Sequence, residues 1–229
     1  QNSMTTLIIG LGEVGRALYK VLYIHSPAVQ DKPGSSITVG AVNIAPEIIH
    51  ICFPYFYTDP FDNFVEEVKK YQKQYQPKYT VIHSTVPVGT SALCSAIHSP
   101  IRGMHPYLAQ GIETFVKFLG GEKASEIANY FRKAGIKIML FDKSETTEAM
   151  KLFDTEYYRT CIEFAQRVKK YCDKNNLNFH EVYTLGNQTY NEGYFELGYP
   201  EFVRPVLQPI MTPIGGHCII TNSKLIDDL

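Results

Sequence analysis

Three glycines near the start of the chain have the spacing of a loop that binds a dinucleotide. Gly10, Gly12 and Gly15 follow residues 5–9, T-T-L-I-I, which predict a buried strand, and lead into a predicted helix over residues 14–24. In this context the first glycine permits a tight turn, the second lets the backbone approach a pyrophosphate, and the third lets helix and strand pack closely. The alternative is a glycine turn that binds nothing.

The start of the predicted helix would face the phosphates of such a dinucleotide. Free N–H groups around Glu13 and Val14, with the positive end of the helix dipole, favour anions there. Further on, Asp31 ends a short predicted strand over residues 28–31, where it would accept hydrogen bonds from the adenosine ribose and favour NAD over NADP. For Asp31 the alternative is a solvated loop aspartate.

A second polar loop follows another predicted strand. Residues 79–83 predict a buried strand, and the run S-T-V-P-V-G-T begins directly after it at Ser84. Ligands of an open parallel sheet bind beyond the carboxyl ends of its strands, so the hydroxyl of Thr85 would reach a cofactor or substrate. A helix cap followed by a proline turn explains the same residues without any ligand.

Two residues in the second half of the chain could also carry chemistry. Lys151 lies on a long predicted helix, one turn before Asp154 and Thr155, where a lysine in a cleft could stabilise an oxyanion or move a proton. An exposed ion pair with Asp154 is the alternative. Cys218 follows two glycines and a histidine, residues 215–217, which leave room for an activated thiol. A buried, unreactive cysteine explains it equally.

The predicted strands alternate with predicted helices. Strands are expected at residues 5–9, 28–31, 48–53, 79–83, 101–104, 114–119 and 136–141, and helices at 14–24, 59–71, 90–97 and 123–133. The alternation predicts an α/β, Rossmann-type, doubly wound and mainly parallel sheet over residues 4–141. Residues 142–229 predict a smaller, mainly helical domain whose long first helix ends near Asp173.

Composition excludes several classes of function. The 229 residues are 45% hydrophobic with a net charge of −1, which predicts no nucleic-acid partner and no anionic lipid surface. No apolar run approaches the roughly 20 residues that span a bilayer, and we expect no secretory signal. Five cysteines without a C-x-x-C pair argue against a disulfide framework or a metal site and favour a cytoplasmic setting.

Taken together, these segments resemble the UDP-glucose/GDP-mannose dehydrogenase family in their order along the chain. The matching segments are Gly10–Gly15, Ile51-Cys52-Phe53-Pro54, Ser84–Thr90, Lys151-Leu152 and Gly215-Gly216-His217-Cys218-Ile219. The last of them is most similar to the UDP-N-acetylmannosamine dehydrogenase branch. The resemblance covers the N-terminal NAD domain and the helical middle domain of that family.

The resemblance implies oxidation of the C6 alcohol of a sugar or nucleotide sugar to a carboxylate with two NAD. It implies that Cys218 attacks the intermediate aldehyde, that Lys151 stabilises the oxyanion, and that Thr85 positions water or substrate. It also implies that Pro54 and Ser84 lie beside the NAD held by the glycine loop.

An apolar stripe on the long helix also implies a homodimer, because the helical domains of this family pair. The stripe comprises Met150, Phe153, Tyr157, Cys161, Phe164, Val168 and Tyr171, which recur at i, i+3 and i+4. We therefore expect the second domain to serve both substrate binding and dimerisation.

Four positions depart from the family's pattern. Carboxylates are expected where Tyr107 and Gly111 stand, an asparagine where Thr155 stands and an aspartate where Asn222 stands. The third domain, which holds the nucleotide of the substrate in this family, is absent from the 229 residues. Three hypotheses stay open: a shortened nucleotide-sugar dehydrogenase, a two-electron dehydrogenase similar to hydroxyacid and 6-phosphogluconate enzymes, and an inactive NAD-binding sensor or partner.

Overall fold

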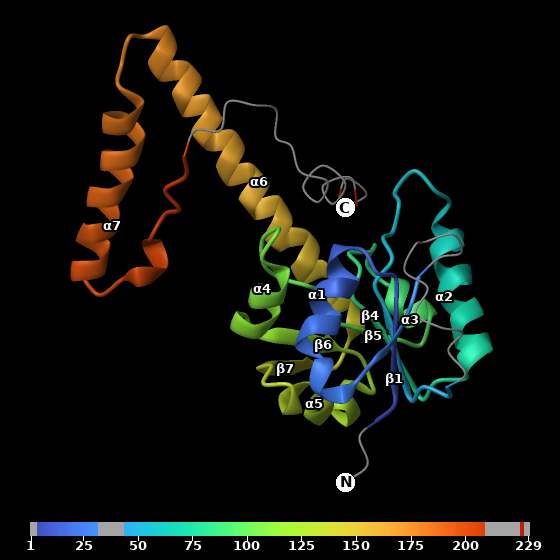
Figure 1. The fold of residues 1–229 in the computed structure, drawn as a ribbon. Coiled ribbons are helices and arrows are strands. Elements are labelled where there is room, and N and C mark those ends of the chain that lie inside the picture. Colours follow the sequence, from blue (N-terminus) through green and yellow to red (C-terminus); the bar gives the residue numbers. More distant parts are fainter. Residues whose placement is uncertain (1–3, 32–43, 209–224, 227–229) are drawn as a thin grey trace. The chain divides into compact units, whose positions relative to one another are not determined.

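The computed structural model describes residues 4–31, 44–208 and 225–226 (Figure 1). The chain divides into two compact units, residues 1–152 and 153–229, and the boundary falls inside the long helix α6 (Ser144–Lys174). None of the helices in the described parts is long and apolar enough to cross a membrane.

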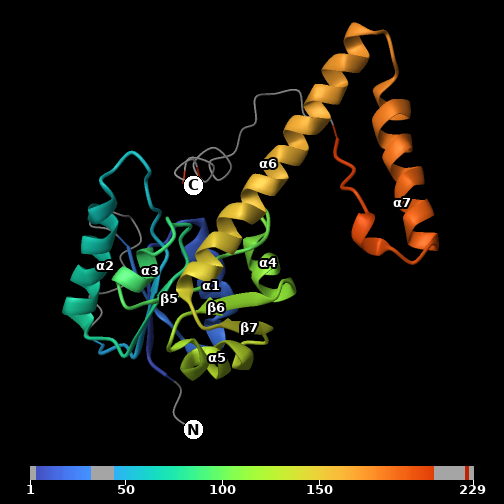
Figure 2. The same cartoon turned by 180° about the vertical axis from the view of Figure 1, so that it is seen from behind.

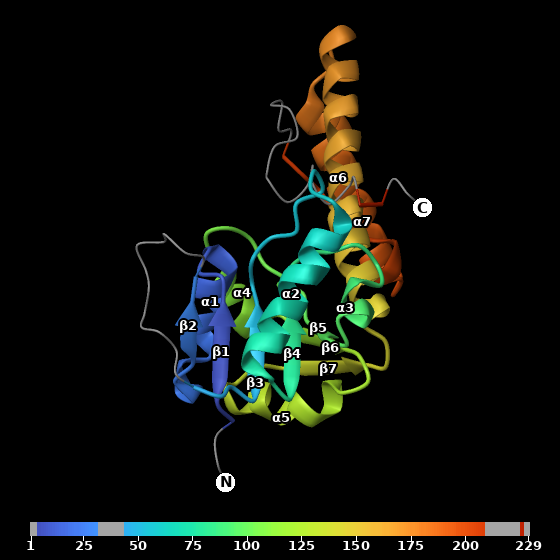
Figure 3. The same cartoon turned by 90° about the vertical axis from the view of Figure 1, so that its right-hand side faces the viewer.

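The first unit contains a seven-stranded sheet in the order β2-β1-β3-β4-β5-β6-β7 (Figure 3). Its strands are β1 (Thr6–Ile9), β2 (Ala28–Gln30), β3 (Ile48–Ile51), β4 (Tyr79–Ile82), β5 (Ile97–His98), β6 (Lys117–Gly120) and β7 (Ile138–Phe141). All neighbours pair in parallel except β5 and β6. Because β2 and β3 lie on opposite sides of β1, the strand order reverses there. The predicted doubly wound, mainly parallel sheet is confirmed.

Helices cover both faces of this sheet (Figures 1 and 2). One face carries α1 (Glu13–Val21), α4 (Leu108–Thr114) and α5 (Ala124–Lys133), and the other carries α2 (Phe61–Tyr75) and α3 (Thr90–Leu93). A short 3-10 turn, η1 (Tyr23–His25), follows α1.

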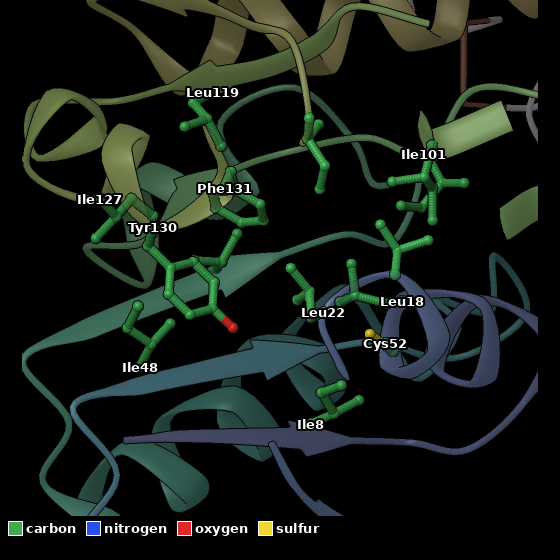
Figure 4. Packing of buried hydrophobic residues seen from close by; sticks show 14 of the residues in the cluster. Ile8, Leu18, Leu22, Ile48, Cys52, Ile101, Leu119, Ile127, Tyr130 and Phe131 are labelled. Carbon is green, nitrogen blue, oxygen red and sulfur yellow. The ribbon is translucent and has the colours of Figure 1, made fainter. Parts of the chain in front are cut away.

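Strand β1 shows why both faces need cover, because side chains alternate along a strand. Ile8 packs with the core of α1 and α5, whereas Leu7 and Ile9 pack with the core of α2. Figure 4 shows the first of these cores, with Leu18 and Leu22 of α1 above Ile8 and with Phe131 and Tyr130 reaching in from α5.

The second unit is helical in its described part. Beyond the end of α6 it contains the π-helical turn η2 (His180–Leu185), helix α7 (Gly186–Glu196) and the 3-10 turn η3 (Pro200–Phe202). The strand-like segment after η3 is fixed to α7 by Asn191, whose side chain donates to the carbonyl of Arg204 and accepts from its N–H, each at 2.8 Å. The predicted mainly helical second part is therefore observed.

Two local predictions were wrong. Residues 101–104 form no strand; instead Ile97–His98 pairs with β4, and the predicted helix over 90–97 ends at Leu93. Pro100 and Gly103 interrupt the segment after β5, so Ile101 reaches the core from a loop. The sequence analysis also missed α4.

The apolar stripe predicted on α6 lies largely at the surface of the chain. Phe153 is 53% exposed, Tyr157 64% and Tyr171 61%. The second unit buries other residues of this helix. These buried residues are Ile162, Ala165 and Cys172. The stripe is thus not the inward face of a single chain.

Candidate functional site

A pocket of about 580 Å³ opens where β1 and β3 end, at the point where the strand order reverses. It is lined by Gly10 and Gly12 after β1, by Asp31 after β2 and by Pro54 after β3. Ligands of open α/β sheets bind at this kind of switch point. Segments that were each proposed from sequence for cofactor binding therefore meet in one cavity.

The three glycines of the loop differ in their surroundings. Gly10 has a φ of +96°, and a Cβ there would lie 2.8 Å from the backbone nitrogen of Phe53. At Gly15 a Cβ would lie 1.8 Å from the carbonyl oxygen of Gly10, so helix and strand touch. A Cβ on Gly12 would have no neighbour within 4 Å. Gly10 and Gly15 are thus required by packing, whereas Gly12 keeps a space open.

The first turn of α1 borders this space. Its cap residue Gly12 has no side chain to cover the first N–H groups, those of Glu13 and Val14 among them. The Glu13 carboxylate pairs with His105, and the Arg16 Nε donates to the carbonyl of Leu11 at 2.8 Å. The exposed amide groups make this helix start a suitable partner for an anion.

The remaining charge in the pocket is mainly negative. Asp31, Asp59 and Glu67 line it together with one cation, Arg16. Gln30, just before Asp31, is fixed to α2 because its side-chain oxygen accepts a hydrogen bond from the Tyr75 hydroxyl. Sequence analysis missed Arg16, Glu67 and Asp59, since a polar residue on an amphipathic helix, or in the turn before one, looks the same whether it faces a pocket or solvent.

Behind the pocket, a chain of buried polar side chains crosses the sheet. The carbonyl of Ser99 accepts from His83 Nδ1 at 2.8 Å, which leaves His83 Nε2 to accept from His50 Nδ1 at 3.0 Å. The same carbonyl accepts from Lys117 Nζ at 3.1 Å. Sequence analysis missed this network, although a histidine inside an apolar strand run was a visible signal.

Burial strongly disfavours charge on these groups. Burial, together with the nearby charge of Lys117, lowers the pKa of His50 and of His98 to about 3 each. It lowers the pKa of Lys117 itself to about 7. The buried histidines are therefore neutral around pH 7, which fits their roles as one-donor, one-acceptor links.

The loop that carries Thr85 is fixed by its neighbours. Ser84 Oγ donates to the carbonyl of Phe53 at 2.6 Å, which joins the ends of β4 and β3, and His98 Nε2 donates to the carbonyl of Ser84 at 3.2 Å. Thr85 itself is half-buried. Lys151 lies close enough to His98 to lower its pKa, so it belongs to the same neighbourhood of the first unit.

Other predicted positions have different outcomes. Cys218 and Asn222 lie outside the described residues, and Thr155 belongs to the second unit. Tyr107 is 55% exposed just before α4. Gly111 is buried, and a Cβ there would lie 2.6 Å from the carbonyl oxygen of Arg102, so packing leaves this position no room for a side chain.

Comparison with solved structures shows which proteins share this fold. UDP-N-acetylmannosamine dehydrogenase from Pyrococcus horikoshii matches with a TM-score of 0.73 at 16% identity, over 97% of this chain and 63% of that protein. The enzyme of the same name from Staphylococcus aureus gives 0.69 at 16% identity, over 97% and 65%. The 3-hydroxyisobutyrate dehydrogenase from Mycobacterium tuberculosis gives 0.61 at 14% identity, over 99% and 80%.

These matches establish the fold, which is the one suggested by the sequence resemblance. UDP-glucose and GDP-mannose dehydrogenases match as well, at 16% and 12% identity. The chain spans less than two thirds of the length of the two UDP-N-acetylmannosamine dehydrogenases. No family model and no curated protein matches the sequence.

The buried histidines predict a loss of stability in acid. Their pKa is lower in the folded than in the unfolded chain, so their contribution is complete above about pH 6.5 and is lost as the pH falls towards 3. Between pH 7 and 5 each should lower the unfolding free energy by about 2 kcal/mol. In His50→Leu the unfolding free energy should therefore fall by about 2 kcal/mol less between pH 7 and 5 than in the wild-type chain. Urea unfolding followed by circular dichroism measures this difference.

The matched control is His180→Leu, which removes an exposed histidine of the second unit. Its pH dependence should equal that of the wild-type chain. An unchanged pH dependence in His50→Leu would show that His50 does not resist protonation.

Proposed function

We propose that the chain is an NAD-dependent oxidoreductase of the nucleotide-sugar 6-dehydrogenase type, acting on the CH–OH group of a sugar or nucleotide sugar. The observation that carries the proposal is the pocket at the strand switch point, because the glycine loop, Asp31 and Pro54 line it together. The matching solved structures are dehydrogenases, which supports an oxidoreductase.

The residues present fit a dinucleotide. The open side of Gly12 and the uncovered N–H groups of Glu13 and Val14 would receive the pyrophosphate. Asp31 would accept hydrogen bonds from the ribose hydroxyls, with Pro54 and Ser84 along the far side of the cofactor. Bound NAD would accept the hydride that leaves the alcohol carbon.

The charges of the pocket favour NAD over NADP. Among the residues that the structure describes, three carboxylates, those of Asp31, Asp59 and Glu67, line the pocket together with a single guanidinium, that of Arg16. Like charges close together repel, so a ribose 2′-phosphate would enter a negative environment, whereas a free hydroxyl would donate to it. We expect NAD to bind at least tenfold more tightly than NADP.

Three residues would carry the chemical steps: Thr85, Lys151 and Cys218. Thr85 would position the substrate or a water molecule, and the Lys151 ammonium would stabilise the oxyanion. The Cys218 thiolate would add to the aldehyde, and loss of a second hydride would give a thioester that water hydrolyses to the carboxylate and the free thiol. Tyr107 and Gly111 supply no carboxylate for that hydrolysis, which favours a shorter reaction as the second candidate.

The second candidate is a two-electron dehydrogenase, and the match to 3-hydroxyisobutyrate dehydrogenase over 99% of this chain supports it. Such an enzyme needs no cysteine nucleophile. The third is an NAD-binding sensor or inactive partner. NAD binding with no turnover across UDP- and GDP-sugars would count against the nucleotide-sugar dehydrogenase, and no turnover of hydroxyacids as well would favour the third candidate over both enzymes.

The glycine loop gives the first test, in which calorimetry measures NAD and NADP binding. Gly12→Ala should fold normally, because Gly12 has a φ of −66° and open space around it, but should bind NAD at least tenfold more weakly. Gly15→Ala should lose about 3 kcal/mol of stability, because its Cβ would meet the carbonyl of Gly10. Wild-type protein that binds neither cofactor would refute the proposal.

The role of Cys218 is tested by counting electrons. Cys218→Ala should stop the reaction after at most one NADH per sugar, because no thioester can form, while Cys161→Ala serves as the control cysteine. The ratio of NADH to substrate consumed is read from absorbance at 340 nm. Two NADH per sugar from the Cys218 variant would exclude the thioester route, whereas one NADH from wild-type chain would support the two-electron candidate.

The exposed stripe of α6 leads us to propose a homodimer as well. Phe153, Tyr157, Phe164 and Tyr171 are each 48% or more exposed in the single chain, and a long apolar helix stripe is a common interface between copies. Tyr157→Glu with Phe164→Glu should shift the mass measured by light scattering from dimer to monomer. A wild-type mass equal to one chain at all concentrations would exclude the dimer.

A further inference from the structure

A buried carboxylate on α6 binds the loop that carries Thr85. Glu148 is 1% exposed, and its two oxygens accept hydrogen bonds from the backbone N–H of Gly89, at 2.6 Å, and of Ser91, at 2.8 Å. Hydrogen bonds to a carboxylate in a buried place are among the stronger ones in proteins. The contact joins residues 59 and 57 positions apart in the chain.

The loop needs this partner because its own side chains do not supply one. Gly89, with a φ of +96°, is the cap residue of α3 and has no side chain to accept the first N–H groups of that helix. Glu148, which belongs to α6, accepts the hydrogen bonds that a cap side chain of α3 would otherwise accept. The same hydrogen bonds favour the carboxylate form, against the burial that raises the pKa of Glu148.

The first turn of α6 also reaches the other end of the loop. Thr147 Oγ1 lies 2.8 Å from His98 Nδ1, and His98 Nε2 donates to the carbonyl of Ser84 at 3.2 Å. The loop from Ser84 to Ser91 is therefore bound directly by Glu148 of α6 at its Gly89–Ser91 end, and at Ser84 by His98, which Thr147 of α6 contacts in turn. Lys151 follows Glu148 by three residues, which places both on one side of that helix.

We propose that Glu148 is a positioning residue that holds the Ser84–Ser91 loop in register with α6, and so sets Thr85 relative to Lys151. This inference rests on the proposed function for its catalytic meaning, since Thr85 and Lys151 are the groups assigned to the substrate. The hydrogen bonds that carry it are independent of that function. Glu148 itself lies buried behind the loop and takes no part in proton transfer.

The test compares Glu148→Gln with Glu145→Gln, which removes the same charge from the same helix, one turn earlier and without contact to the loop. In Glu148→Gln an amide N–H₂ faces a backbone N–H, so one hydrogen bond is lost and two donors oppose each other. Hydrogen exchange of a peptide covering residues 86–93 should become at least tenfold faster, while the control should match wild type.

Two further readouts separate positioning from a general loss of structure. NAD affinity should stay within about twofold, because the pocket residues do not contact Glu148, while kcat should fall at least tenfold with little change in KM for the sugar. Lys151, mapped by acetic anhydride labelling and mass spectrometry, should react severalfold faster in Glu148→Gln only. If that variant does not fold, Glu148→Asp, which keeps a shortened carboxylate, should show the same changes to a smaller extent.

The outcomes distinguish this inference from the proposed function. Exchange of residues 86–93 and labelling of Lys151 equal to the control would overturn it, whatever the enzyme does. A fall in NAD affinity that parallels the fall in kcat would also overturn it, because the effect would then be structural. Faster exchange and faster labelling in a protein that never turns over a sugar would support the positioning contact and refute the nucleotide-sugar dehydrogenase.

Discussion

The carbonyl of Ser99 accepts hydrogen bonds from His83 and from Lys117, and so joins β4, β5 and β6 inside the sheet. These two hydrogen bonds matter because β5 and β6 run antiparallel and share a single register pair, His98 with Gly120. The backbone alone joins β6 to β5 with two ladder bonds at most. Side chains thus supply, in a dry interior, the cohesion that longer strands would provide through their backbones.

The same network explains why the candidate site is well defined. His83 directly precedes Ser84, and Ser99 begins the segment that leads to His105, the partner of Glu13 at the start of α1. The loop after β4 and the segment after β5 therefore both begin at one buried set of hydrogen bonds. Since an unpaired buried polar group destabilises a fold, the loops have few alternative conformations open to them.

The sequence could predict the sheet and the glycine loop because their signals are local. Residues 5–9 and the three glycines that follow combine apolar run, turn and helix within a short window. It could not predict Glu148 or Lys117, since each acts on backbone groups far away in the chain, and a lone charged residue has the same appearance on a solvated face. Strand β5 was missed because two residues carry no periodicity; pairing with β4 created it.

Gly111 constrains how this protein could change over evolutionary time. Its position has no space for a Cβ because the chain at Arg102 and Gly103 passes against it. A mutation that introduced a carboxylate at this position would first meet this backbone, and would be lost unless the 102–103 segment had already moved. The order of substitutions is therefore restricted: the backbone at residues 102–103 must move before an acidic side chain can be accommodated at position 111.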